Sequence, residues 1–384
     1  MPGQPLPTSF EPVNLLVRGV NWLGDAVMTT PAMLRLRERF PRSRITLLTS
    51  AKLVDLWALH PAVDRVVTFS ADENPWTLGG RLRRDGFDAA LVLPNSMRSV
   101  LEVWWAGIPK RIGYAGNWRR CFLTGPMAYP GDRVRLRQRG VREIKRLLRA
   151  KQQATPAGED SPYVHQIHDY LELVSALGAD PTPLPPRLEL SKDEIESATA
   201  ACLSAQQVGE KGDRPDSTAV WLGLNPAAAY GPAKCWPAER FAEVAREVSK
   251  RLPDAIWLCF GAPTDWQTCQ RIVELAGNRV INLAGKTSLR QLMALLKKCR
   301  LLLTNDSGPM HVAAALGTPV VVPFGSTSPE LTGPGEPGDP RHHLLTSAAA
   351  CSPCFRRTCP IDFRCMIGIP AERVVAAVFE SIDD

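Results

Sequence analysis

Short apolar runs alternate with amphipathic stretches along most of the chain, and this alternation predicts strands joined by helices. Residues 13–18 are typical of the first strand of a parallel sheet, and residues 26–40 follow with apolar positions at helical spacing. The alternation continues to residue 114 and returns between residues 220 and 323. Strands that alternate with helices form βαβ units. We therefore expect an α/β fold made of two Rossmann-like halves.

The predicted domain boundary lies in a proline-rich segment. Residues 181–186 read Pro-Thr-Pro-Leu-Pro-Pro, which favours a stiff linker. We expect an N-terminal domain over 1–180 and a C-terminal domain over 181–369, with a final helix over 370–384 that packs back on the N-terminal domain. Polar loops are expected at 153–162 and 208–216. Ligands of such sheets bind outside the carboxyl ends of the strands.

Composition and charge narrow the class of protein. With 384 residues, 45% hydrophobic and 22% charged, the chain is an ordinary globular protein, and it has no apolar run of membrane-spanning length. The polar, proline-rich start lacks a secretion-signal pattern, so we expect a cytosolic protein. The net charge of +7 is unevenly placed. Basic residues crowd residues 110–151, against only Asp132 and Glu143: Lys110, Arg111, Arg119, Arg120, Arg133, Arg135, Arg137, Arg139, Arg142, Lys145, Arg146, Arg149 and Lys151.

Such a basic block is typical of a protein with a polyanionic partner. Nucleic acid, an anionic membrane surface and a phosphorylated substrate all fit it. A solvated loop and helix face is the plainer alternative.

The turn over residues 304–311 carries the clearest candidate chemistry. It follows the apolar run Leu301-Leu302-Leu303 and precedes a short helix, with Ser307 as a good N-cap. The free N–H groups beside Ser307 and Gly308 form a favourable place for an anion such as phosphate. Asp306 and His311 flank them and can bind hydroxyl groups. A capped strand–helix junction without a ligand is the alternative.

Asp25 is a second candidate, because it follows the first predicted strand and opens the first helix. A carboxylate facing a cleft can act as a general base on a hydroxyl. An N-cap is the plainer interpretation, since Asp is among the best capping residues.

Two further strand ends carry charged residues. The loop from Asn225 to Pro237 contains Lys234 just before a predicted helix, where it can neutralise a diphosphate. The loop lacks the Gly-Lys-Ser/Thr ending of a Walker A motif. Asp265 follows another strand, and an acid there often binds a ribose hydroxyl. A solvated lysine and an N-cap are the respective alternatives.

Four of the ten cysteines cluster near the C-terminus, at Cys351, Cys354, Cys359 and Cys365. They are candidate ligands of a structural zinc, although the segment has only one CxxC knuckle. An iron–sulfur cluster, a local disulfide and a reduced cysteine-rich loop are the alternatives.

Taken together, these loops resemble glycosyltransferase family 9, the ADP-heptose:lipopolysaccharide heptosyltransferases, and within it the heptosyltransferase II group. The resemblance covers the chain from about residue 13 to its end and is carried by five segments: residues 21–26, 225–237, 305–311, 324–329 and 351–365. It implies a GT-B fold, in which two Rossmann-like domains face each other across a cleft.

The resemblance also implies roles for individual residues. Asp25 would be the base of an inverting, metal-independent transfer of heptose from ADP-heptose to heptosyl-Kdo-lipid A. Donor binding would involve Asn225, Lys234, Asp265, Asp306, Ser307, Gly308 and His311. Arg119 and Arg120 are candidates for the phosphorylated acceptor, although residues 119–158 do not align clearly with the family. Asp362-Phe363-Arg364 replaces an expected His-containing stretch, which weakens the zinc interpretation.

The resemblance implies an enzyme peripheral to the cytoplasmic face of the inner membrane, with no nucleic acid partner and no cofactor required for catalysis. Three alternatives remain open at this point. They are a family 9 transferase with another acceptor, a GT-B sugar-nucleotide epimerase, and a basic lipid- or nucleic-acid-binding module without activity.

Overall fold

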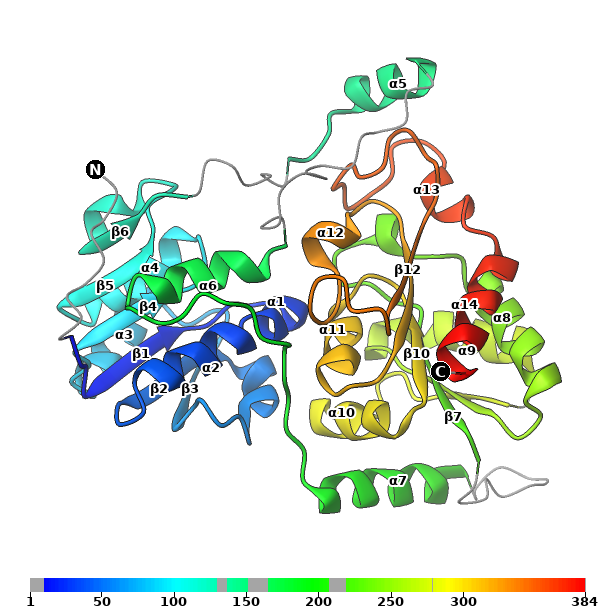
Figure 1. The fold of residues 1–384 in the computed structure, drawn as a ribbon, viewed down its shortest axis with the longest axis horizontal. Helices are drawn as coiled ribbons and strands as arrows, with labels where there is room; N and C mark the ends of the chain where they lie inside the picture. Colours follow the sequence, from blue (N-terminus) through cyan, green and yellow to red (C-terminus); the bar gives the residue numbers. More distant parts are fainter. Residues whose placement is uncertain (1–9, 130–136, 151–164, 207–218, 278, 384) are drawn as a thin grey trace. The chain divides into compact units, whose positions relative to one another are not determined.

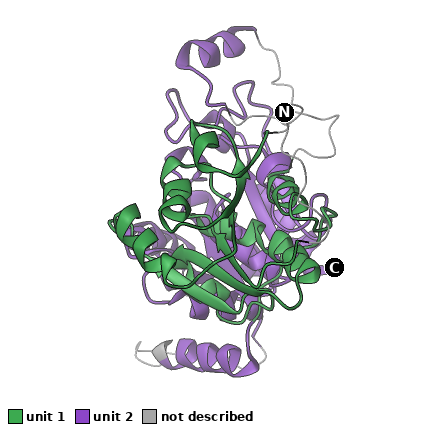
Figure 2. Cartoon of the chain, turned by 90° about the vertical axis from the view of Figure 1, so that its left-hand side faces the viewer, with its two compact units in different colours: residues 1–133, 161–189 green, residues 134–160, 190–384 purple. Residues whose placement is uncertain are grey.

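The computed structural model describes residues 10–129, 137–150, 165–206, 219–277 and 279–383 (Figure 1). The chain divides into two compact units (Figure 2). Unit 1 comprises residues 1–133 and 161–189, and unit 2 comprises residues 134–160 and 190–384. The loops expected at 153–162 and 208–216 lie outside the described residues, as do Asp132, Arg133, Arg135 and Lys151 of the basic block.

Unit 1 is built on a parallel six-stranded sheet in the order β3-β2-β1-β4-β5-β6. The strands carry mostly buried aliphatic side chains, as expected for a sheet covered on both faces. Its elements are β1 (Asn14–Arg18), α1 (Leu23–Met28), α2 (Thr30–Arg39), β2 (Arg44–Ser50), the 3₁₀ helix η1 (Ala51–Trp57), β3 (Arg65–Phe69), α3 (Pro75–Arg83), β4 (Ala89–Val92), α4 (Met97–Trp105), β5 (Lys110–Tyr114), the 3₁₀ helix η2 (Arg119–Phe122), β6 (Gly125–Met127) and α6 (Ile167–Ser175).

Unit 2 repeats this arrangement with the strand order β12-β11-β10-β7-β8-β9. Its elements are α5 (Val141–Ala150), α7 (Lys192–Gln206), β7 (Trp221–Asn225), η3 (Pro232–Lys234), α8 (Ala238–Arg251), β8 (Ile256–Cys259), η4 (Pro263–Asp265), α9 (Trp266–Ala276), β9 (Val280–Asn282), α10 (Leu289–Lys298), β10 (Leu301–Thr304), α11 (Gly308–Ala315), β11 (Val320–Phe324), α12 (Pro329–Thr332), β12 (His343–Thr346), α13 (Arg364–Ile367) and α14 (Ala371–Asp383).

Each sheet reverses its strand order at one point, between β1 and β4 in unit 1 and between β7 and β10 in unit 2. Open parallel sheets bind ligands at such a switch point, outside the carboxyl ends of the strands. In unit 2 the last residues of the two switch strands, Asn225 and Thr304, are direct partners in the sheet register. The expected α/β fold with two Rossmann-like sheets is confirmed.

The division into units differs from the expected boundaries at three places. Residues 181–189 belong to unit 1, while residues 134–160 belong to unit 2. The C-terminal helix, which we expected to pack back on the N-terminal domain, belongs to unit 2. Helix α14 packs on α8 and on strands β10 to β12, and its Val374 and Val378 are part of the core of unit 2. The hydrophobic pattern of α14 predicts a buried face but does not identify its partner.

Several elements differ from the sequence prediction because they are short or locally irregular. Residues Ala51–Trp57 form a 3₁₀ helix, η1, and the short strands β6 and β12 were not expected. Helix α5 lies inside the basic block. Its Ile144 packs with Cys351 and Cys354, so contacts distant in sequence support this helix.

Candidate functional site

The switch point of unit 2 is held together by two asparagines. The Asn225 amide donates hydrogen bonds to Thr304 Oγ1 at 3.0 Å and Ser307 Oγ at 2.9 Å. Asn305 donates to the carbonyl of Pro226 at 2.6 Å and accepts from the backbone N–H of Trp236 at 2.9 Å. These bonds fix the loop that follows β7 against the turn that follows β10.

Lys234 reaches the same place from η3. Its ammonium lies 2.6 Å from Asp306 Oδ2, with the two side chains 12% and 4% exposed, and 4.8 Å from the centre of the Tyr230 ring. Thr327, from the loop after β11, donates a hydrogen bond to Asp306 Oδ2 at 2.5 Å. The loops after three neighbouring strands therefore meet at one buried ion pair. Asp306, expected to bind ligand hydroxyls, is engaged by Lys234 and Thr327.

Helix α11 starts at this ion pair. Ser307 is its N-cap residue, in an extended conformation and without a side-chain capping bond, and Gly308 and Pro309 form the first turn. His311 is buried, with 5% of its surface exposed. The helix start thus lies next to the Lys234 ammonium, and both favour negative charge at this sheet edge.

Asp265 has a structural partner. Its Oδ2 accepts the backbone N–H of Ala262, the N-cap residue of η4, at 2.8 Å. Asp265 is also the N-cap residue of α9, as considered from the sequence, but it makes no side-chain capping bond there. It also lines a cavity of about 520 Å³ that is bounded by the loop at residues 226–238 and by α13. Asp265 and the Lys234 loop therefore border one cavity within unit 2.

The cysteine segment packs beneath the Lys234 loop. The carbonyls of Phe355 and Arg357 accept hydrogen bonds from Tyr230 Oη at 2.7 Å and from the backbone N–H of Ala233 at 3.0 Å. Gly231 has a φ of 147°, and a Cβ there would lie 2.5 Å from the Arg357 carbonyl oxygen. Only glycine allows this close approach, so the cysteine segment helps to shape the Lys234 loop.

The four clustered thiols are free, and three of them are buried. Burial raises the pKa of Cys351, of Cys354 and of Cys365, the last to about 12, and the neighbouring thiols add to the shift. Among the described residues, no three His, Cys, Asp or Glu side chains are grouped to hold a metal ion. Cys351 and Cys354 pack with Ile144, and Cys359 Sγ accepts a hydrogen bond from the backbone N–H of Phe363 at 3.2 Å.

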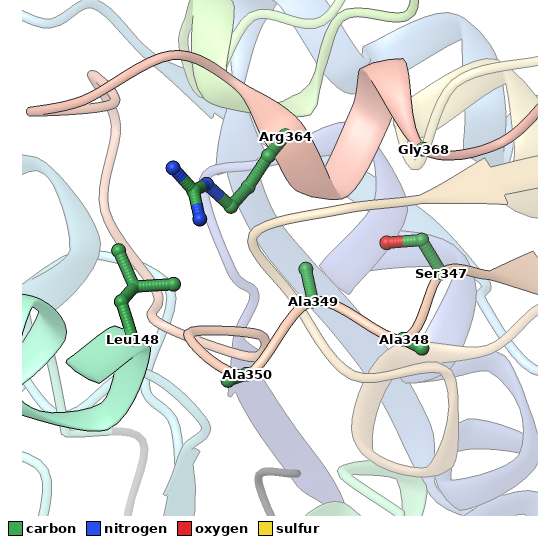
Figure 3. A pocket seen from close by; sticks show the side chains of 7 residues that line it. All are labelled: Leu148, Ser347, Ala348, Ala349, Ala350, Arg364 and Gly368. Carbon is green, nitrogen blue, oxygen red and sulfur yellow. The ribbon is translucent and has the colours of Figure 1, made fainter. Parts of the chain in front are cut away.

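A second cavity, of about 470 Å³, lies beside the cysteine segment (Figure 3). It is lined by Leu148 of α5, residues 347–350, Arg364 and Gly368. Arg364 is bound to Asp362 at 2.7 Å, and the lining otherwise consists mostly of small side chains. We assign no role in the reaction to this cavity.

In unit 1, Asp25 lies in the first turn of α1, after the switch strand β1. The N-cap of this helix is Trp22, so the interpretation of Asp25 as the capping residue is wrong. The Asp25 carboxylate is close enough to Tyr170 of α6 to raise the pKa of its phenol. The pKa of the Tyr170 phenol is raised well above 10, first by burial and then by Asp25.

Arg18 and Glu102 form a buried ion pair below this loop. Their side chains are 1% and 0% exposed, and Arg18 Nε donates to Glu102 at 2.7 Å. Arg18 also donates to Asn21 Oδ1 at 3.0 Å, which ties the pair to the loop before Asp25. Arg98 completes the network with a 2.9 Å bond to Glu102. Sequence reasoning missed this network, because charged residues in a strand and a helix carry no motif.

Arg119 is fully buried yet mostly unpartnered. Its Nη1 donates to Asn95 Oδ1 at 3.0 Å, but Nε and Nη2 have no hydrogen-bond partner among the described residues. Burial lowers the pKa of this guanidinium to about 10. Asn95 follows β4 and Arg119 follows β5, so both lie at the sheet edge that carries Asp25. A buried, incompletely bonded guanidinium is suited to an anionic group. Arg120 is exposed.

Comparison with known proteins identifies the family. Residues 76–363 match the model of glycosyltransferase family 9 (heptosyltransferase), which is more than half of the chain. The chain belongs to glycosyltransferase family 9. It is therefore an enzyme that transfers a glycosyl group.

Its relatives include lipooligosaccharide heptosyltransferase 2 of Haemophilus ducreyi, 31% identical over 84% of this chain and 86% of the relative. Lipopolysaccharide heptosyltransferase 2 of Escherichia coli is 30% identical over 84% of this chain and 85% of that protein. The solved structure of E. coli ADP-heptose lps heptosyltransferase II matches with a TM-score of 0.72 and 26% identity, covering 96% of this chain and 98% of the other. This match confirms the expected GT-B class of α/β fold.

The structure brings together most residues predicted for the donor side. Within unit 2, Asn225 is bonded to Ser307, and Lys234 is paired with Asp306, the residue before Ser307. Thr327 is bonded to Asp306, and its signal was its position three residues after the end of strand β11. In unit 1, Asp25 and Arg119 follow different strands of the same sheet edge.

Proposed function

We propose that the protein transfers L-glycero-D-manno-heptose from ADP-heptose to the heptosyl-Kdo-lipid A inner core of lipopolysaccharide. The observation that carries this proposal is the Lys234 ammonium, held beside the α11 helix start at the switch point of unit 2. This arrangement occurs in a chain related over 84% of its length to heptosyltransferase 2 proteins.

On the donor side, Lys234 and the N–H groups beside Ser307 and Gly308 bind the diphosphate. Asp306 and Thr327 hold the ammonium in place, which limits the reorganisation needed when negative charge grows on the departing ADP. Stabilisation of that charge lowers the barrier more than it tightens ground-state binding. Asp265 borders the cavity that would take the nucleoside, and Asn225 keeps the two loops together.

On the acceptor side, Asp25 acts as the general base. The acceptor hydroxyl gives its proton to the Asp25 carboxylate while its oxygen forms a bond to the anomeric carbon of the heptose. The bond from that carbon to the diphosphate oxygen breaks, and ADP leaves with the electron pair. Attack opposite the leaving group inverts the anomeric configuration. Lys234 and the helix start supply the positive charge for this step, so we propose that no metal ion is required.

Arg119 and Arg120 bind an anionic group of the acceptor. The support for Arg119 is its burial with two unpartnered nitrogen atoms, which a phosphate or carboxylate would satisfy. We further propose that the enzyme acts on the cytoplasmic face of the inner membrane, as a peripheral protein without a nucleic acid partner. None of the described helices is long and apolar enough to cross a membrane.

The proposal is tested with ADP-heptose and three acceptors, Kdo-lipid A carrying zero, one or two heptoses. Release of ADP is measured for each acceptor, and the product is identified by mass spectrometry. We expect release with the one-heptose acceptor. Transfer only to another acceptor would reassign the enzyme within family 9, and epimerisation of free ADP-heptose without transfer would contradict the proposal.

A further inference from the structure

Four aromatic side chains form a continuous row on unit 1. The Trp76 and Trp105 ring centres are 4.8 Å apart, those of Trp105 and Trp104 are 5.9 Å apart, and those of Trp104 and Phe122 are 5.3 Å apart. The three tryptophans are 43%, 40% and 39% exposed in that order, and Phe122 is half-buried. We call these four residues the aromatic row.

The row spans three elements of unit 1, α3, α4 and η2, of which α3 and α4 are labelled in Figure 1. The core side of α4 is formed by Ser99, Val100, Glu102 and Val103. Its outer side carries Leu101, Trp104 and Trp105, which are one turn apart and form a second apolar stripe. A surface helix normally has polar residues there, and packing against α3 covers Trp105 only in part and leaves Trp104 exposed.

The packing beneath the row fixes its shape. Gly79 of α3 lies so close to α4 that a Cβ would come within 2.8 Å of Trp105 Cβ. Trp105 is therefore wedged between the helices, while Trp76 and Trp104 extend on either side of it. Trp105, packed in this way, has little side-chain entropy to lose on binding.

The three elements that carry the row contain a single acidic residue, Glu102, which is buried in ion pairs with Arg18 and Arg98. Asp72 and Glu73 precede α3 and Asp85 follows it; Glu73 and Asp85 form salt bridges with Arg81 and Arg65. Arg83 and Arg84, at the end of α3, are exposed, and neither forms a salt bridge with a described residue. Arg83 also donates a hydrogen bond to the Trp105 carbonyl at 2.7 Å, which holds it beside the row.

We propose that the aromatic row, with Arg83 and Arg84 beside it, docks unit 1 on an anionic phospholipid bilayer. Tryptophan prefers the boundary between headgroups and acyl chains, and arginine binds the phosphates above it. The proposal rests on the proposed function, since a lipid-anchored acceptor places the enzyme at a bilayer. A protein partner of the same surface would more often carry acidic residues opposite the arginines, without any need for lipid.

Sedimentation with vesicles of phosphatidylethanolamine and phosphatidylglycerol tests the surface directly. We expect Trp76→Ala/Trp104→Ala to weaken vesicle binding about tenfold, as for the loss of two partly inserted rings. Arg83→Gln/Arg84→Gln should weaken it about fivefold per charge, and only when phosphatidylglycerol is present. Both variants leave Trp105 and the core unchanged, and circular dichroism verifies folding.

Two control variants test whether the loss of any exposed tryptophan or arginine weakens vesicle binding. Trp266, in unit 2, is 46% exposed, and Trp266→Ala should bind vesicles as the wild type does. Arg142→Gln/Arg146→Gln removes exposed charge from α5 instead. Unchanged binding in both Trp76→Ala/Trp104→Ala and Arg83→Gln/Arg84→Gln, or loss of binding in the α5 variant alone, would overturn the proposal.

Transfer assays with two forms of the acceptor test membrane docking separately from the proposed function. With a deacylated, water-soluble acceptor, Trp76→Ala/Trp104→Ala should retain wild-type turnover. With acceptor embedded in vesicles, its turnover should fall about tenfold. An equal loss with both acceptors would contradict membrane docking, whereas vesicle binding without any transfer by the wild type would contradict only the proposed function.

Discussion

The buried guanidinium of Arg119 gives the sharpest prediction about unit 1, because its effects on stability and on activity should have opposite signs. Burial lowers its pKa from 12.5 to about 10, and the unfolded chain has the ordinary value. The folded state therefore holds the proton less tightly. Below pH 10 the guanidinium is charged in both states, and its burial costs about 3 kcal/mol.

Replacement by methionine removes that cost together with the hydrogen bond to Asn95. A bond to a charged group contributes about 1.5–3 kcal/mol. We therefore expect Arg119→Met to leave the free energy of unfolding unchanged or to raise it by about 1 kcal/mol. Arg18→Met is the matched control, because Arg18 is equally buried but paired with Glu102. Its loss should destabilise unit 1 by about 3 kcal/mol.

Urea unfolding at pH 7, monitored by circular dichroism, measures both variants. Steady-state kinetics then measures the KM for the acceptor and the KM for ADP-heptose separately. The KM for the acceptor should rise thirtyfold or more in Arg119→Met, since a buried charged contact contributes at least about 2 kcal/mol. The KM for ADP-heptose should stay the same. If Arg119→Met is as unstable as Arg18→Met and keeps the acceptor KM, the assignment of an anion-binding role is wrong.

Three other predictions concern the donor site, acid stability and metal dependence. Lys234→Met should lower kcat/KM for ADP-heptose about a hundredfold, as for a lost charge-assisted contact of about 3 kcal/mol. Lys250→Met, at an exposed position of α8, should leave kcat/KM unchanged. If Lys234→Met has the same kcat/KM as the wild type, Lys234 does not bind the donor. Burial lowers the pKa of His60 to about 4 from 6.5, so the folded state takes up fewer protons than the unfolded chain between these values. The free energy of unfolding should be highest above pH 6.5 and fall by about 3 kcal/mol as the pH decreases to 4. The urea midpoint of His60→Asn should decrease less over this range than that of the wild type. An identical decrease would show that His60 is not the cause. Transfer should persist after dialysis against EDTA, and activity that returns only with added metal would contradict the proposed charge stabilisation by Lys234.

Hydrophobic alternation was sufficient to predict the two parallel sheets, because strands buried on both faces read as apolar runs. It could not predict β6 and β12, which are three and four residues long. The elements on which α14 packs could not be predicted from the sequence either. An amphipathic helix shows that it has a buried face, but any apolar surface of either domain can cover that face.

In the site, some residues could be predicted from their position after a strand, whereas their contacts could be known only from the structure. Lys234 and Asp306 were found as charged residues at strand ends, yet their 2.6 Å ion pair depends on the register of β7, β10 and β11. The buried state of Arg119 could not be read from a basic block whose other described members are mostly exposed. Thr327 was quoted within a family segment, but its bond to Asp306 required the structure.

The central claim is that Asp25 removes the acceptor proton while unit 2 holds ADP-heptose. The most direct test measures, in the same Asp25→Asn protein, ADP-heptose binding by calorimetry and transfer to heptosyl-Kdo-lipid A. Asp72→Asn, at an exposed position of unit 1, is the control for the loss of a carboxylate. We predict that Asp25→Asn binds the donor with wild-type affinity and has no measurable transfer, while Asp72→Asn remains active. Retained turnover in Asp25→Asn would contradict the account.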